Sequence, residues 1–259
     1  MPLLYWKGSN FGDLLNETLL RPLLEPAILE EKEVLGIGTI LDSNFVGARE
    51  QVVVMGSGIG RGAIPKSKIL PLLVRGPHTA LALHAPHLPQ GDPGLLLESS
   101  GSQPRAGGVL IPHFRTFTRV PAAKLARVTG LRVLDVRWKP AKMLARLEGA
   151  SHAYVEALHG AIACEALRIP WAPVQLAANE PPIKWMDALG PLKRAFILPP
   201  VYRPPWARRS IELLTRKHLL ARFPDGVSGG GTELGSDGQL TSIRKTIWRA
   251  LDRFNSGDH

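Results

Sequence analysis

Short runs of apolar and β-branched residues recur along the chain, separated by helical or glycine-containing segments. The runs fall at 3–6, 34–37, 52–55, 72–74, 109–111, 131–134 and 153–155. Strands that read as nearly continuous apolar runs are typical of parallel sheets that are covered on both faces. The pattern therefore predicts an α/β protein built around parallel sheets.

Helical patterns at 121–128, 140–148 and 158–167 alternate with the later strands, and strand, helix, strand in this order implies right-handed βαβ units. Between 91 and 108 the pattern gives way to Gly, Pro, Ser and Gln, which indicates a linker. We therefore expect two Rossmann-like lobes with a cleft between them, and a C-terminal helical extension. The predicted boundaries are 1–100, 101–198 and 199–259.

The C-terminal quarter differs from the rest of the chain. Two proline pairs precede a predicted helix at 206–223, the glycines at 229–231 predict a flexible loop, and a last helix follows Leu240. Apolar residues recur in that last helix at helical spacing, whereas most of its basic residues fall elsewhere: Ile243, Ile247, Leu251 and Phe254 against Arg244, Lys245, Arg249 and Arg253. This helix either packs on the core with a solvated basic face or contacts anionic lipid at a membrane surface.

Composition limits the class of protein. The 259 residues are 44% hydrophobic and 21% charged, which is ordinary for a globular protein with a sizeable core. The single cysteine, Cys164, excludes an internal disulfide framework and suggests a buried thiol in an apolar helix. We see no apolar run long enough to cross a membrane and no leader pattern, so we expect a soluble cytoplasmic protein. The formal charge of +10 favours anionic partners.

The segment 156–162 places a histidine and a glycine where a short strand gives way to a helix. At that position His159 faces the crevice in which parallel α/β folds bind ligands, and histidine is the usual proton carrier at neutral pH. A hydrogen-bonded structural histidine is the plain alternative. Arg75 likewise ends a strand before a Gly-Pro pair that starts a helix, where it would bind a phosphate or carboxylate or form a surface salt bridge.

Other strand ends carry candidate residues. Asn10 and Asp13 follow the first strand, and each would either cap a helix or contact a ligand. Gly56 and Ser57 follow the third strand in a glycine-rich stretch whose backbone N–H groups could cradle an anion. His113 ends the first strand of the second lobe. His84 and His87 lack a third ligand in view, so we expect no metal, and the motifs of the common hydrolases are absent.

Read in order, several motifs resemble the polysaccharide pyruvyl transferase family. The closest likeness is to the branch that adds ketal pyruvate to succinoglycan-type exopolysaccharides. The elements that carry it span residues 6 to 185: Trp6-Lys7-x-x-Asn10-Phe11-Gly12-Asp13, Gly36-Ile37-Gly38-Thr39-Ile40-Leu41, Met55-Gly56-Ser57-Gly58, Arg75-Gly76-Pro77, Gly91-Asp92-Pro93, Pro112-His113, Glu156-Ala157-Leu158-His159-Gly160-Ala161-Ile162 and Lys184-Trp185.

The resemblance implies a two-lobed fold similar to the GT-B glycosyltransferases. It also implies phosphoenolpyruvate as donor substrate, no further cofactor, and a pyruvate ketal on a saccharide acceptor, which we expect to be lipid-linked. By the same resemblance Arg75 and the Leu158-His159 pair bind the donor, and His159 delivers a proton to its methylene carbon. We expect Gly56, Ser57, His113 and Lys184 on the donor side as well.

The remaining roles are assigned as expectations. Glu156 is the candidate base for the acceptor hydroxyl, although a strand-end carboxylate could equally pair with a lysine. Asn10 and Asp13 are expected to line the acceptor side. Some members of the family carry arginine where this chain has Ala157, so a second cation must come from elsewhere or is missing; the candidates are Arg61, Lys66, Lys184 and Arg203.

Three alternatives stay open. A glycosyltransferase that uses a nucleotide sugar would share the two-lobed architecture. A nucleic-acid-binding protein would explain the charge, but the basic residues are spread out and no recognition module is visible, so we expect no nucleic acid. A family member without activity is suggested by Ala157. We expect a cytoplasmic pyruvyltransferase, compatible with peripheral contact at the inner face of the membrane.

Overall fold

The computed structural model describes residues 3–101, 104–176, 181–193 and 234–257. It confirms a mixed α/β protein in which both sheets are parallel throughout their described strands. The chain divides into two compact units. The first contains residues 1–97 together with 181–196 and 235–259, and the second contains 98–180 and 197–234. The predicted helix at 206–223 and the glycines at 229–231 lie outside the described residues.

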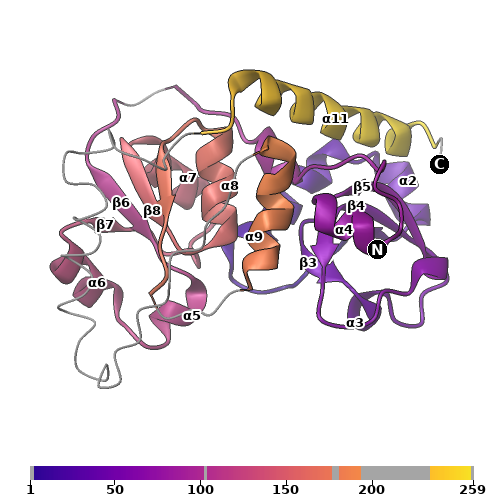
Figure 1. Ribbon diagram of the computed structural model, residues 1–259, viewed down its shortest axis with the longest axis horizontal. Helices are drawn as coiled ribbons and strands as arrows, with labels where there is room; N and C mark the ends of the chain where they lie inside the picture. The colour runs from indigo at the N-terminus through magenta and orange to yellow at the C-terminus, as the bar shows by residue number, and fades with distance from the viewer. Residues whose placement is uncertain (1–2, 102–103, 177–180, 194–233, 258–259) are drawn as a thin grey trace. The chain divides into compact units, whose positions relative to one another are not determined.

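The first unit is built on a five-stranded sheet (Figure 1). Its strands are β1 (Leu3–Leu4), β2 (Val34–Leu35), β3 (Gly38–Leu41), β4 (Val52–Ile59) and β5 (Ile69–Val74). The long strand β4 pairs with β5 on one side, and on the other side with β2 and then with β3. The core of this sheet is formed by buried apolar residues, of which Leu35, Val52, Val54 and Val74 belong to the predicted runs.

Short helices connect and cover these strands: α1 (Phe11–Leu15), the π-helical turn η1 (Asn16–Leu20), η2 (Arg21–Leu23), α2 (Pro26–Glu31), α3 (Ser43–Val46), η3 (Lys66–Lys68), α4 (Pro77–Ala82) and η4 (Pro93–Leu96). Three further elements belong to the same unit although they come late in the chain: α9 (Pro182–Leu189), η5 (Gly190–Leu192) and α11 (Asp237–Asn255). In Figure 1 the yellow helix α11 runs along this unit, where it packs against β5, η4 and η5.

The second unit has a four-stranded sheet in the order β7-β6-β8-β9. The strands are β6 (Gly108–Ile111), β7 (Arg132–Val133), β8 (His152–Val155) and β9 (Trp171–Pro173). Helices α5 (Phe114–Phe117), α6 (Ala122–Thr129), α7 (Pro140–Glu148) and α8 (Leu158–Ala166) follow these strands or connect them. Three of the helices match the predicted ranges to within a residue at either end. Cys164 is a buried free thiol in α8, as the sequence suggested.

Two sequence-based expectations differ from the structure. The segment 91–97 is not a linker, because Asp92 is fully buried and accepts the backbone N–H of Gly94 to begin η4. The unit boundaries differ as well, since 181–196 and 235–259 are grouped with the N-terminal unit rather than with a second lobe and a separate extension. The physical reason is packing: the apolar face of α11 buries Ile243, Ile247 and Leu251.

The basic helix near the C-terminus is therefore packed back on the core, with the four predicted apolar positions buried. It begins with a capping box in which the Ser236 hydroxyl and the Gln239 side chain each accept a backbone N–H of the other residue. Among the described residues, no helix combines the length and the apolar character that a membrane crossing needs.

Candidate functional site

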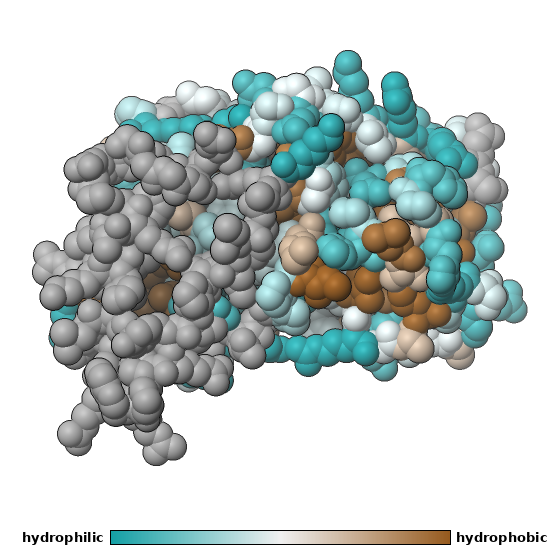
Figure 2. Space-filling model, in the orientation of Figure 1, coloured by the Kyte–Doolittle hydropathy of each residue, from teal (hydrophilic) through white to brown (hydrophobic). Residues whose placement is uncertain are grey.

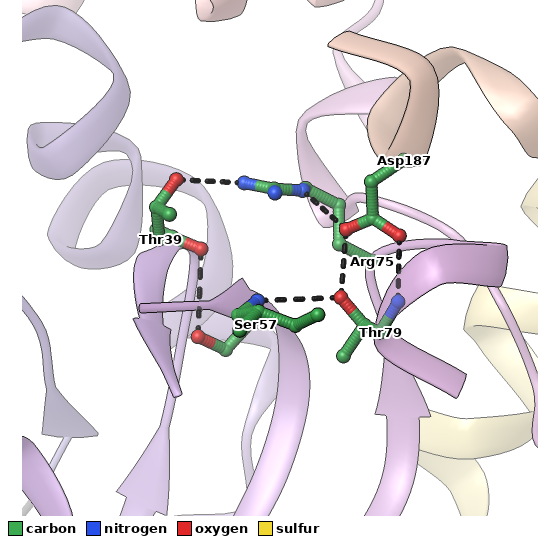
Figure 3. Close-up of polar contacts among 7 residues, drawn as sticks. Thr39, Ser57, Arg75, Thr79 and Asp187 are labelled. Atoms are coloured by element: carbon green, nitrogen blue, oxygen red, sulfur yellow. Dashed lines mark hydrogen bonds and ion pairs between the residues drawn. The ribbon is translucent and has the colours of Figure 1, made fainter. Parts of the chain in front are cut away.

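The carboxyl end of β5 carries a buried ion pair. Arg75 is 1% exposed, and its Nε donates to the Asp187 carboxylate at 3.1 Å, while Nη1 donates to the Thr39 hydroxyl at 2.8 Å (Figure 3). Asp187 also accepts the backbone N–H of Thr79 at 2.9 Å and its hydroxyl at 2.7 Å. Arg75 is therefore neither a surface salt bridge nor an unrestrained cation, because one carboxylate fixes its orientation.

Two of the three guanidinium nitrogens of Arg75 donate hydrogen bonds. Within the described part of the chain, Nη2 of Arg75 makes no hydrogen bond, while Nε and Nη1 are both engaged. Two glycines make room for this arrangement. A Cβ at Gly58 would collide with the guanidinium, and a Cβ at Gly76 would collide with the backbone carbonyl of Asp187. These close approaches give a physical reason for glycine in the Gly58 and Arg75-Gly76-Pro77 positions.

Sequence reasoning missed Asp187, which lies on α9, 112 positions after Arg75. It also missed two side chains that shape neighbouring strand ends. Asn16, fully buried, accepts the N–H of Ile37 at 2.7 Å and donates to its carbonyl at 2.9 Å, which holds the turn between β2 and β3. Asp42 accepts N–H groups from α3 and from Arg61 and Gly62. Polar residues directly after apolar strands were the available signal for Asp42.

The glycine-rich stretch is not a turn after the third predicted strand. Gly56 and Ser57 lie inside β4, where Ser57 pairs with Gly38 of β3 and with Val74 of β5. The Ser57 hydroxyl is fully buried and donates to the Gly38 carbonyl at 3.4 Å (Figure 3). Strand pairing occupies this backbone, so the predicted anion cradle is wrong as a local structure. Strand pairing overrode the local preference of glycine for a turn.

Asn10 and Asp13 lie at the start of α1. Asn10 occupies the N-cap position, but its side chain makes no capping hydrogen bond, and both residues are half-buried. Lys184 lies in the first turn of α9, three residues before Asp187, and so belongs to the first unit rather than to the lobe expected from the sequence. Arg61 and Lys66 are exposed, and Arg203 lies outside the described residues.

The second unit gathers its candidate residues at the carboxyl end of its own sheet. Glu156, 3% exposed, directly follows β8 and accepts the backbone N–H of His113 at 2.9 Å and of Leu176 at 2.7 Å, as well as the Thr116 hydroxyl. These contacts tie the loops after β6 and β9 to the end of β8. The geometry assigns Glu156 to loop positioning, which does not favour the expected role as a base.

His159 is the second residue of α8, half-buried, directly after Leu158. His113 caps α5, since its Nδ1 accepts the N–H of Arg115 at 3.3 Å, and its ring packs on Phe114. Ala157 occupies the N-cap position of α8 and is 7% exposed. The structure therefore places His113, Leu158 and His159 at one sheet edge in the second unit, and Arg75 and Lys184 in the first.

Across residues 3–101, 104–176, 181–193 and 234–257, no three His, Cys, Asp or Glu side chains gather closely enough to hold an ion. What the two edges offer is a buried, oriented guanidinium in one unit and a histidine at a helix start in the other.

The fold is that of an α/β protein with two parallel sheets, and Arg75 and Glu156 each directly follow a strand at a carboxyl edge. The chain is 29% identical over 197 residues to the succinoglycan biosynthesis protein ExoV of Rhizobium meliloti (strain 1021), a match covering 71% of this chain. It confirms the resemblance to the succinoglycan branch of the polysaccharide pyruvyl transferase family. The matched residues span 62% of the length of that relative. No family model matches the chain, and no solved structure matches it either.

Proposed function

We propose that this protein transfers pyruvate from phosphoenolpyruvate to a sugar of an exopolysaccharide repeat unit, where it forms a ketal. The observation that carries the proposal is the ordered set of motifs across residues 6 to 185, together with the similarity to a succinoglycan biosynthesis protein over 197 residues. The proposal includes the GT-B-like fold that the resemblance implies. It also includes a lipid-linked acceptor at the inner face of the membrane.

The chemistry sets three requirements. The donor's phosphate and carboxylate need cationic partners, its methylene carbon must gain a proton, and the acceptor hydroxyls must lose theirs. Two hydroxyls of one sugar form two C–O bonds to the central carbon of the donor, while the C–O bond to phosphate breaks. Of the two hydroxyl protons, one balances the proton added to the methylene and the other leaves with phosphate.

Arg75 can provide the cationic partner for the donor's phosphate or carboxylate through one guanidinium nitrogen, Nη2. Asp187 fixes Nε and Thr39 fixes Nη1, so the guanidinium plane is set before a ligand arrives, and Nη2 is left for the donor anion. A preoriented donor of this kind loses less conformational freedom on binding than a solvated side chain does. Asp187 is accordingly a positioning residue in this proposal, and Lys184 on the same helix supplies a second cation where family members carry arginine in place of Ala157.

His159 meets the second requirement as the proton carrier to the methylene carbon, because it stands at the start of α8 after a buried strand. His113 follows β6 and Leu158 follows β8 at the same edge of the sheet, and we assign both to the donor pocket in that unit. Asn10 and Asp13 are assigned to the acceptor. Glu156 acts through the loops that it holds rather than as the base.

The test is calorimetric titration of phosphoenolpyruvate into the full chain, with a panel of nucleotide sugars in parallel. His159→Ala is matched by His152→Asn, which changes a half-buried histidine at the amino end of β8, whereas His159 follows the carboxyl end of that strand. Arg75→Lys replaces Arg75→Ala as the variant of choice, because it keeps a positive charge beside buried Asp187 while it removes the fork of N–H donors.

We expect the wild type and His152→Asn to bind phosphoenolpyruvate, and His159→Ala and Arg75→Lys to bind at least about tenfold more weakly, as the loss of one charge-assisted hydrogen bond implies. If a nucleotide sugar gives a heat of binding and phosphoenolpyruvate gives none, the proposal is wrong and the protein is a glycosyltransferase. Binding that is unchanged in both variants would overturn the site assignment while leaving the donor class intact.

A further inference from the structure

A pocket of about 440 Å³ lies on the first unit, where α11 meets the segment that follows α4. Its apolar lining includes Leu88, Ile243 and Ala250, and its basic lining consists of His87, Arg249 and Arg253. None of these residues belongs to the proposed donor or acceptor site. This volume lies in the range of ordinary small-molecule pockets, roughly 300–1,000 Å³.

The arginines of α11 divide into two kinds. Arg244 is used by the fold, since it donates to the carbonyls of Leu95 and Leu97 at 2.8 Å each. Arg249 and Arg253 are exposed, and neither guanidinium makes a hydrogen bond or ion pair within the described residues. In Figure 2 hydrophilic side chains project from the surface above this helix.

The spacing of the two unused arginines has an energetic consequence. They stand four residues apart on one helix, so they are neighbours on its surface, and like charges at this spacing destabilise an isolated helix by about 0.2–0.5 kcal/mol. Arg253 lies in the last turn, where the helix dipole compensates a positive charge. That compensation falls off within one turn and does not reach Arg249. Arg249 therefore gains no stabilisation from the helix dipole to offset its repulsion from Arg253.

We propose that this pocket binds a phosphate group whose ester-linked neighbour rests on the apolar wall. Two guanidinium groups present planar forks of N–H donors that match phosphate oxygens, and His87 adds a third nitrogen-bearing side chain from the other wall. The apolar wall formed by Leu88, Ile243 and Ala250 favours an amphipathic phosphate ester over a fully polar one. The same chemistry is offered by the headgroup of a lipid and by a phosphate ester in solution.

The test uses the full chain with Arg249 and Arg253 both changed to Gln, and Lys245→Gln as the matched control. Lys245 is exposed on the same helix and carries the same charge but does not line the pocket. One arm measures binding of inorganic phosphate and of glycerol 3-phosphate by calorimetry. The other arm measures co-sedimentation with phosphatidylcholine vesicles that contain or lack phosphatidic acid. Circular dichroism verifies that each variant is folded.

We expect the double variant to lose at least about tenfold in affinity, and Lys245→Gln to stay within about twofold of the wild type. Binding in the solution arm assigns the pocket to a soluble phosphate ester, and binding only to vesicles with phosphatidic acid assigns it to a lipid; both support the inference. An equal loss in Lys245→Gln would show a diffuse charge effect, and silence in both arms would show no phosphate site. Either result overturns the inference, and neither bears on the phosphoenolpyruvate titration.

Discussion

Removing the carboxylate of Asp187 is the perturbation for which the structure gives the clearest magnitude. Its side chain and that of Arg75 are each 2% exposed, and Asp187→Ala would leave a buried guanidinium without a counter-ion. It would also leave the N–H and hydroxyl of Thr79 without their acceptor. Breaking one partner of a buried ion pair costs about 3–5 kcal/mol, which is a large fraction of the roughly 5–15 kcal/mol of a typical domain.

The matched comparison is Glu17→Ala, which breaks the Arg21–Glu17 pair on the surface of the same unit, where the side chains are 43% and 37% exposed. Exposed pairs contribute only about 0–1 kcal/mol. Urea unfolding gives the free energies, and hydrogen exchange at the Val53 amide, which donates to the Glu33 carbonyl, reports on the first unit alone. The double variant Arg75→Met, Asp187→Leu should recover most of the loss, because it removes both charges together.

A loss below about 1 kcal/mol in Asp187→Ala, equal to that in Glu17→Ala, would refute this reasoning. It would mean that water or a rearranged side chain compensates Arg75, and the guanidinium would then be free to move. In that event the argument that Asp187 orients Arg75 for the donor would fail as well. Phosphoenolpyruvate binding by the wild type would still stand as a separate result.

Three further outcomes follow from single positions. Gly76→Ala should destabilise the protein by about 1–3 kcal/mol because the added Cβ meets the Asp187 carbonyl, whereas Gly238→Ala, with open space around it in the first turn of α11, should stabilise it by up to about 1 kcal/mol; thermal unfolding compares them. Asp42→Ala should cost about 1–3 kcal/mol in urea unfolding, because N–H groups of α3 and of the loop after β4 lose their acceptor, while Asp42→Asn should lose less because its amide oxygen can still accept. Burial lowers the pKa of His152 below its usual value, so the unfolded chain binds protons more tightly. Stability should therefore fall as pH drops through about 6.5, and His152→Asn should flatten that slope in urea unfolding, whereas an unchanged slope would contradict it.

Local pattern was enough to predict most strands and several helices, because their signals lie within a few residues. Helix α7 begins at Pro140 and ends before Gly149, where proline and glycine mark the boundaries. Strand β3 was missed because its start, Gly38-Thr39, carries little strand preference and is fixed by pairing with β4. The segment at Gly91 was misread as a linker because its packing partners, Ile243 and Ile247, come about 150 positions later.

In the candidate site, too, features with a local signal could be predicted and long-range partners could not. The position of Arg75 at the end of a strand could be predicted, since the Gly-Pro pair that follows it starts a helix. Its partner could not, because α9 carries no local signal that directs Asp187 to β5. Glu156 was singled out correctly as a strand-end carboxylate, yet its hydrogen-bond partners come from loops after two other strands. Long-range partners decide whether such a residue is free to react.

The first unit closes on itself with residues from far along the chain. The side chain of Asn255 accepts the N–H of Glu25 at 2.7 Å and donates to the carbonyl of Leu23 at 3.0 Å, and Arg244 holds the carbonyls of Leu95 and Leu97. During synthesis the sheet strands leave the ribosome long before these residues do. The apolar surface that α11 covers therefore stays open until residues 237–255 have emerged, and a chaperone that binds exposed apolar segments has that interval in which to act.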